Sequence, residues 1–170
     1  MGTRTATVEP QRKGVDGGAL IRAAVVASVA TLLMYLYLVP VLVGAGNAAV
    51  ILRYMASVVM GADVLPPPAN LSPTIMLAAL AVHAGISLSM AAVIAFILHR
   101  WGLLTGIIGG AVLGLVFFAI IHYSLTLIHP HFYAMNHWSV ALVHAVFGAI
   151  AGGIYELYEC EPGEQLEGSL

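Results

Sequence analysis

The sequence predicts an all-helical integral membrane protein that crosses the bilayer four times. Three observations support this fold class. Hydrophobic residues make up 61% of the 170 residues and charged residues only 8%, whereas a soluble domain carries about 25% charged residues. Four apolar stretches each reach the roughly 20 residues that a membrane-spanning helix needs. None of them alternates between apolar and polar residues as the strands of a membrane β-barrel do.

The four predicted spans lie in a transmembrane domain over residues 19–158. Pro40 lies near the far end of the first span, where a kink or a helix end is tolerated. Ser72 and Pro73 begin the second span with a capping hydroxyl followed by a proline in the first turn, which is a typical helix start. The spans are expected over residues 20–43, 73–98, 103–128 and 138–158.

The connection between the first two spans contains a further apolar segment, residues 48–60, which is too short to cross a bilayer. Arg53 and Ser57 lie four residues apart and therefore share one helical face. We expect a short interfacial helix with that face turned to water. Three prolines at residues 66–68 then predict a stiff extended spacer.

Both ends of the chain are polar, and we expect both to be cytoplasmic. Residues 1–18 lack apolar periodicity and predict a disordered tail, and residues 159–170 predict an acidic tail. No cleavable signal peptide is expected, because the first apolar stretch exceeds the about 7–15 residues of a signal sequence. The positive-inside rule favours this orientation in a bacterial inner membrane, since cations gather on one side. The inner side would carry Arg4, Arg12, Lys13, Arg22 and Arg100, and the outer side Arg53.

The composition argues against several function classes. A formal net charge of -2 provides no basic field for nucleic acid. A single cysteine leaves no intramolecular disulfide and no pair of thiols for metal or redox chemistry. Apart from Glu156 at the inner end of the fourth span, the spans contain no carboxylate, and no nucleophile, base and acid occur together, so we expect no enzyme.

Small residues recur at four-residue spacing in the third and fourth spans. Such stripes let helices approach closely in a bilayer, where no hydrophobic force draws helices together. The stripe would pack within this bundle or against a partner subunit or a second copy. Its members are Gly106, Gly110, Gly114, Gly148 and Gly152.

Three histidines lie inside the predicted spans. With a rise of about 1.5 Å per residue, His83 lies roughly 15 Å from the outer end of its span, and His122 and His144 roughly 9 Å from theirs. Ionisable groups at such depth usually face the bundle interior. A purely structural role would need hydrogen-bond partners on neighbouring helices. Candidates are Ser87, Ser89, Tyr123, Ser124 and Thr126.

Two functional roles of this histidine layer also stay open. Val-His-Ala occurs in the second and fourth spans, which fits two duplicated hairpins and puts His83 and His144 at matching positions. Two facing imidazoles have the chemistry to ligate a b-type haem or a metal, with His122 nearby. A proton path is the other role, although it would lack the usual membrane carboxylate.

The outer connection between the last two spans holds a second group of metal donors: His129, His131, His137 and Met135. Imidazoles and a thioether are suitable ligands for copper, whereas the lack of thiolate and carboxylate argues against structural zinc. The alternative is an interfacial loop whose rings anchor at the headgroups. Asn136 is expected to cap the last span.

The order of these features resembles a group of small four-helix bacterial inner-membrane proteins of unknown function, some of them labelled symporters. The likeness covers residues 20–158. It rests on "ATLLMYLYLVP", "RYMASVVMGAD", "VHAG", a glycine-rich third span and "LVHAVFGAIAGGIY". The resemblance implies location and architecture only, and the histidine-rich outer loop departs from it.

We therefore expect a non-catalytic accessory or small subunit of a larger bacterial membrane complex, respiratory or photosynthetic. Its histidine layer would be structural or would bind haem or a metal. The alternatives are a small oligomeric transporter or permease, and copper handling at the periplasmic face. Partners would be the lipid bilayer and other membrane subunits or copies of itself, but not nucleic acid.

Overall fold

The computed structural model describes residues 14–44 and 47–159, and it confirms the predicted fold class. Within these ranges every regular element is helical, and four helices are long and apolar enough to cross a membrane. The first span, Gly17–Leu42, consists of α1 (Gly17–Leu33), the π-helical turn η1 (Met34–Leu38) and α2 (Val39–Leu42). The other spans are α4 (Pro73–Leu98), α5 (Leu103–Ile128) and α6 (Trp138–Tyr158), and the shorter elements are α3 (Ala48–Met60), η2 (Ala62–Val64) and η3 (Pro130–Met135).

The first span differs from the prediction at its start and in its second half. It begins at Gly17 rather than at residue 20, because Asp16 caps it by accepting hydrogen bonds from the N–H groups of Gly18 at 2.7 Å and Ala19 at 3.0 Å. The chain then widens into the π-helical turn η1 just before Pro40. Proline has no N–H and its ring collides with the carbonyl one turn back, so a wider turn is a common accommodation.

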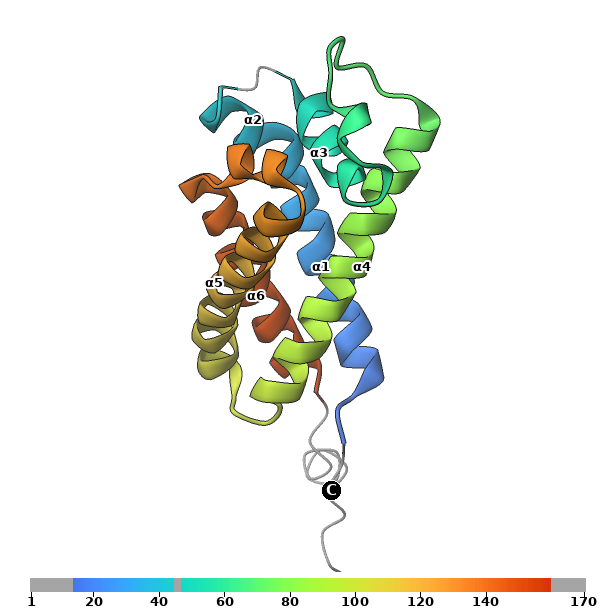
Figure 1. Cartoon of the computed structure of the whole chain (residues 1–170). Helices are drawn as coiled ribbons and strands as arrows, with labels where there is room; N and C mark the ends of the chain where they lie inside the picture. The colour runs from blue at the N-terminus through green and yellow to red at the C-terminus, as the bar shows by residue number, and fades with distance from the viewer. Residues whose placement is uncertain (1–13, 45–46, 160–170) are drawn as a thin grey trace, which may run out of the picture.

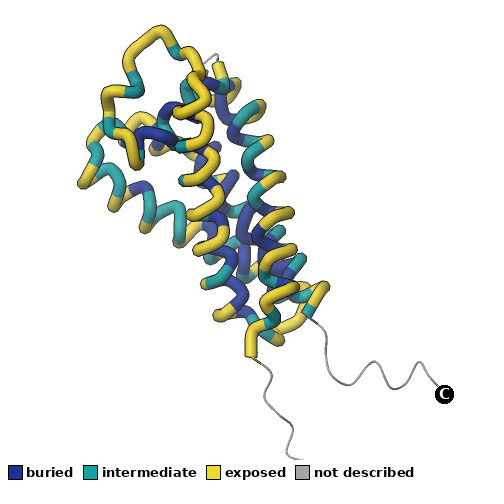
Figure 2. Tube along the Cα trace, turned by 90° about the vertical axis from the view of Figure 1, so that its right-hand side faces the viewer, coloured by how far each residue is buried: buried dark blue, intermediate teal, exposed yellow. Residues whose placement is uncertain are grey.

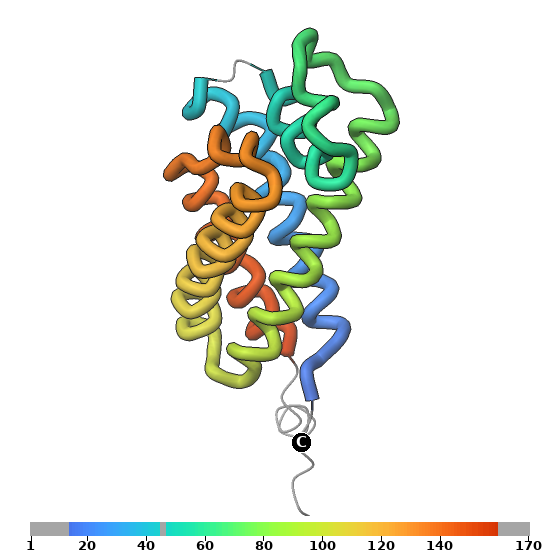
Figure 3. Tube along the Cα trace, in the orientation of Figure 1, coloured from blue at the N-terminus to red at the C-terminus, as the bar shows by residue number. Residues whose placement is uncertain are grey.

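The two described ends of the chain lie at the same end of the bundle (Figure 1), as an even number of spans requires. We call this the terminal end, and the opposite end, which carries α3 and η3, the loop end (Figure 3). The greater parts of the tails predicted over 1–18 and 159–170 lie outside the described residues. α6 is the central helix: 50% of its most apolar window is buried, against 17% for α5.

Each span has an exposed outward face (Figure 2), and the large residues on these faces are mostly apolar. On α5, for example, Leu104 is 71% exposed and Leu127 87% exposed. Several polar side chains, including the three histidines of the spans, are instead buried inside the bundle. This distribution is the reverse of that in a soluble protein and fits a lipid environment, so the chain is a multi-pass membrane protein.

The α5–α6 interface is made by backbone contact. A Cβ atom added at Gly110 would lie 2.1 Å from the carbonyl oxygen of Gly148, and one added at Gly148 would lie 1.9 Å from that of Gly110. A Cβ atom added at Gly114 would lie 2.0 Å from the carbonyl oxygen of His144. A Cβ atom added at Gly152 would lie 2.1 Å from the carbonyl oxygen of Gly106. The glycine stripe therefore packs within this bundle and positions α5 against the histidine-bearing face of α6.

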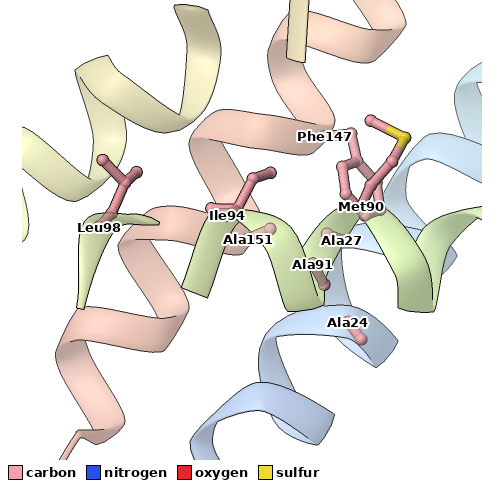
Figure 4. Packing of buried hydrophobic residues seen from close by; sticks show 8 residues of the cluster. All are labelled: Ala24, Ala27, Met90, Ala91, Ile94, Leu98, Phe147 and Ala151. Atoms are coloured by element: carbon pink, nitrogen blue, oxygen red, sulfur yellow. The ribbon is translucent and has the colours of Figure 1, made fainter. Parts of the chain in front are cut away.

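Small side chains also close the terminal half of the bundle. A cluster between α1, α4 and α6 fills this region (Figure 4), and its alanines allow the helices to approach closely. Met90 and Phe147 lie together at one end of the cluster. Its buried members are Ala24, Ala27, Met90, Ala91, Ile94, Leu98, Phe147 and Ala151.

The short helix α3 forms where predicted, but the expectation that its polar face meets water is wrong. Arg53 is 7% exposed and Ser57 0%. The Arg53 guanidinium points into the connection to α4. There it donates to the carbonyl oxygens of Val64, Pro66, Pro68 and Asn70 and to the side-chain oxygen of Asn70. The chain folds back over α3 and satisfies the charge with carbonyl dipoles, so the polar face becomes an internal one.

Candidate functional site

The three histidines of the spans line one cavity of about 90 Å³ near the loop end. It lies between two apolar clusters. Met90 and Phe147 border it on the terminal side, and Tyr35, Phe132 and Met135 border it on the loop side. We call this space the histidine cavity. No lining residue is an aspartate, glutamate, lysine or arginine, so the cavity combines apolar walls with a few neutral polar groups, as small-molecule sites commonly do.

The hydrogen bonds of His83 and His144 define which ring nitrogen carries the proton. His83 Nε2 lies 3.0 Å from the carbonyl oxygen of Ser28, and His144 Nδ1 lies 2.9 Å from that of Val140. A carbonyl oxygen only accepts, so both of these nitrogens donate. In the neutral rings Nδ1 of His83 and Nε2 of His144 are then acceptors, and neither has a hydrogen-bond partner among the described residues.

Tyr35, on the π-helical turn, adds a hydroxyl to the same space. Its oxygen lies 3.4 Å from His144 Nδ1, and its ring stands edge-on to His83 with centroids 6.1 Å apart. Since His144 Nδ1 is the donor, the tyrosine oxygen accepts there and its own proton stays available. No motif or spacing in the sequence singles out Tyr35. The sequence shows only that Tyr35 is a polar aromatic residue deep inside an apolar span. Its proximity to two histidines depends on how the helices pack.

His122 is the least satisfied polar side chain in the cavity. It is 7% exposed, and its Nδ1 has no hydrogen-bond partner in the described structure. The carbonyl oxygen of Phe118, one turn earlier, is within electrostatic reach but outside hydrogen-bonding geometry. Its ring lies over Phe118 with centroids 4.6 Å apart and edge-on to His144 at 5.4 Å. Packing therefore holds the ring in place and leaves its polar atoms unused.

None of the hydroxyl groups proposed as histidine partners serves in that role. The side chains of Ser89 and Thr126 donate instead to the backbone carbonyls of Gly85 and His122, and Tyr123 is 62% exposed. Ser87 lines the cavity. His83 and His144 bond instead to backbone carbonyls, which no residue-type pattern reveals, and His144 also contacts the hydroxyl of Tyr35.

The arrangement does not fit a b-type haem. His122 and His144 meet where the backbones of α5 and α6 touch, so no macrocycle can lie between their rings. Tyr35 contacts both His83 and His144 in the space between them, and about 90 Å³ is less than the roughly 150 Å³ that holds a benzene molecule. The different hydrogen bonds of His83 and His144 also give the duplication hypothesis no support.

The outer-loop donors are divided among different roles. His131 Nε2 donates to Ser57 Oγ at 3.0 Å, since that hydroxyl already donates to the Tyr54 carbonyl. His129 lies beside it with ring centroids 5.5 Å apart. Burial of His131, followed by the charge of His129, lowers the pKa of His131 below its ordinary value.

The other two donors of the loop have structural positions. His137, not Asn136, caps α6, because its Nδ1 accepts a hydrogen bond from the Ser139 N–H at 3.3 Å. Met135 is 7% exposed inside the apolar cluster of the loop end. In the described ranges no three histidine, cysteine or acidic side chains are placed to hold one metal ion. Among the described residues, the loop therefore presents the histidine pair His129 and His131 rather than a cluster of three such donors.

The fold and the cavity define a class: a four-helix, multi-pass membrane protein with a small internal cavity lined by neutral polar side chains. Comparisons with protein-family models, curated proteins and solved structures found no match to this chain. The function of this chain must therefore be inferred from the site itself.

Proposed function

We propose that this protein is a non-catalytic membrane protein that binds a small, uncharged, hydroxyl-bearing group in the histidine cavity. The single observation that carries the proposal is His122, whose Nδ1 is buried without a partner beside open space. An unsatisfied buried polar group costs about 1–3 kcal/mol. A ligand that supplies the missing hydrogen bond removes this cost and gains the corresponding affinity.

The chemistry of the lining supports an uncharged ligand. No ionised side chain borders the cavity to balance a ligand charge, and an unpaired charge in such surroundings is strongly unfavourable. The free lone pairs on His83 and His144 accept hydrogen bonds, and the Tyr35 proton donates one. A hydroxyl group, which both donates and accepts, complements this set. The lining contains no carboxylate or thiol that would act as a nucleophile.

The setting that we propose is a bacterial inner membrane with the terminal end in the cytoplasm. Arg22 and Arg100 support this orientation, because both belong to the terminal end of the bundle and the positive-inside rule places such residues in the cytoplasm. In that setting the chain would act as a small subunit that supplies a ligand site to a larger membrane complex. Co-purification from native membranes tests this role, which fails if the chain is recovered alone.

A small carrier is the second candidate, and one observation favours it. The cavity is closed toward the terminal end by Met90, Phe147 and the alanine cluster. Phe132 and Met135 cover it toward the loop end, and a site that is covered toward both ends corresponds to the occluded state of an alternating-access cycle. Ligand flux into liposomes that contain only this chain would support the carrier. Saturable binding without flux would leave the binding role alone.

The binding proposal is tested with phenol, whose hydroxyl-bearing edge would enter the cavity of about 90 Å³ while the rest of the ring lies at the open side of the cavity. Ring-labelled histidines are followed by NMR with the protein in lipid nanodiscs, and anisole serves as the ligand control without a donor. We expect saturable shifts of the cavity histidines with phenol only. His122→Phe keeps the stacking on Phe118 and should weaken phenol binding about tenfold, since 1.4 kcal/mol is tenfold in affinity.

His129→Phe is the matched control, because this histidine lies outside the cavity lining. It should leave phenol binding unchanged. If phenol and anisole give equal shifts, or if the cavity takes up water only, the proposal is wrong.

A further inference from the structure

The histidine cavity opens on one side of the bundle. Most of its lining side chains are buried, and the half-buried ones mark the opening. They come only from α3, α4 and α5, and all but one are purely hydrocarbon or thioether. These residues are Tyr54, Met55, Val58, Val82, Ile86, Ile121 and Leu125. We call this opening the lateral window.

The course of α4 and α5 explains the window. The two helices are joined by the tight turn at residues 99–102 and diverge toward the loop end (Figures 1 and 3). α5 packs mainly on α6 and makes far fewer contacts with α4. The glycine contacts hold the α5 backbone against that of α6, whereas toward α4 Gly109 faces the side chain of Leu98 close to the turn. A gap between α4 and α5 follows, with apolar side chains on both edges.

Other routes into the cavity are closed by apolar side chains. Phe132 and Met135 of η3, which are 5% and 7% exposed, cover it toward the loop end. Met90 and Phe147 close it toward the terminal end. Because α4 and α5 both span the membrane, the lateral window faces the hydrocarbon region. A ligand that passes through this window must therefore be dissolved in the bilayer.

We propose that the occupant of the histidine cavity is a phenolic amphiphile, which enters from the bilayer through the lateral window between α4 and α5. Its hydroxyl donates to an imidazole nitrogen of the cavity and accepts from Tyr35, while its apolar tail lies in the window. Reduced membrane quinones belong to this chemical class. This inference rests on the proposed function and adds the source and the shape of the ligand.

The lining favours an aromatic ring over an aliphatic alcohol. Aromatic side chains stand on several sides of the cavity, among them Tyr35, Phe132 and Phe147, and edge-to-face contacts between rings are favourable. Met55, Met90 and Met135 add polarisable sulfur, which prefers aromatic neighbours. The small cavity volume accommodates the hydroxyl-bearing edge of a ring, and the open window accommodates the rest. A phenol is also a more acidic donor than an alcohol, so it bonds more strongly to an imidazole.

The test uses 4-decylphenol in nanodiscs, with affinity expressed as mole fraction in the lipid and with the shifts of the cavity histidines as the signal. 4-Decylanisole has the same shape without the donor, and 1-decanol has a donor without the ring. We expect 4-decylphenol to bind at least tenfold more tightly than either. Equal affinity for 4-decylanisole or for 1-decanol would overturn the inference.

Window variants test the route. Leu125→Trp and, on the opposite edge, Val82→Trp should each weaken 4-decylphenol binding at least tenfold. Ile120→Trp, on the lipid-exposed face of α5, is the matched control and should leave it unchanged. Unchanged binding in both window variants would overturn lateral access.

The two proposals fail in different ways. Phenol that binds to wild-type protein while 4-decylphenol does not leaves the proposed function standing and removes this inference. Failure of both ligands removes both proposals.

Discussion

The backbone contact between α5 and α6 makes the substitution Gly148→Ala unusually informative. The new Cβ would lie 1.9 Å from the carbonyl oxygen of Gly110, whereas close C···O contacts between helices are about 3.3–3.6 Å. The two helices must therefore separate locally by more than about 1 Å. Overpacking usually costs about 1–3 kcal/mol of unfolding free energy. We expect the upper part of this range, because a carbonyl in a helix cannot rotate away as a side chain can.

Gly85→Ala is the matched control for this substitution. Gly85 is an exposed residue in the middle of α4, and nothing lies within 4 Å of the Cβ that it would acquire. Alanine in place of glycine in a helix interior is neutral or stabilising by about 0.5–1 kcal/mol. The two variants make the same chemical change in spans of the same protein, so their difference reports the α5–α6 contact.

The unfolding free energy of both variants is measured in the same mixed micelles, and the ring signals of His122 and His144 are recorded as a local readout. The Gly148→Ala variant should be less stable than the control by about 2–3 kcal/mol. It should also shift both ring signals, since the rings are 5.4 Å apart across the widened interface. If the two variants unfold with equal free energy, the close approach of α5 and α6 is refuted.

Three further predictions concern the ends of the bundle. Tyr155→Phe removes a hydroxyl that accepts a hydrogen bond from the Asp16 N–H, just before α1, and contacts the ends of α4 and α6. This substitution should lower the free energy of unfolding by about 1–2 kcal/mol and speed hydrogen exchange at the start of α1. Unchanged exchange there would contradict the prediction. Arg53→Met removes the hydrogen-bond donors that hold the loop of residues 61–72. A protease should therefore cleave this loop faster while the spans stay intact. Arg53→Lys should restore the protection of the loop only partly, because an ammonium group lacks the planar array of donors of a guanidinium. The NMR titration midpoint of His131 should lie below the ordinary value of about 6.5 and rise in His129→Gln. Because folding lowers this pKa, the contribution of His131 to stability is present above about pH 6.5 and is lost as the pH falls toward the folded pKa. A titration midpoint of His131 at or above the ordinary value would contradict the prediction.

The helix boundaries could be predicted where a local signal existed. α4 begins at Pro73 after Ser72, whose hydroxyl accepts from the Ile75 N–H at 3.3 Å. The start of the first span was placed three residues late, because two glycines after Asp16 resemble a tail. The carboxylate cap overrides that weak propensity.

The orientation of Arg53 could not be predicted, and the physical reason is general. A charged residue on a short apolar helix is expected at the water interface, because the sequence offers no buried counter-charge. The structure uses carbonyl groups of the following connection instead. Every residue has a carbonyl group, so the identities of the residues do not show which carbonyl groups will converge on one side chain.

Two properties of this protein can be derived from its amino-acid sequence alone: it has four membrane-spanning helices, and three of them carry a histidine at similar depth. These properties follow from local apolar length and from the fixed rise of a helix, which need no knowledge of packing. The shared cavity of the histidines with Tyr35, and the missing partner of His122, become visible only when the helices are packed together. The gap between α4 and α5 likewise depends on the tertiary packing of the helices. These properties depend on which helix faces touch, and here the backbone contact of α5 with α6 decides that.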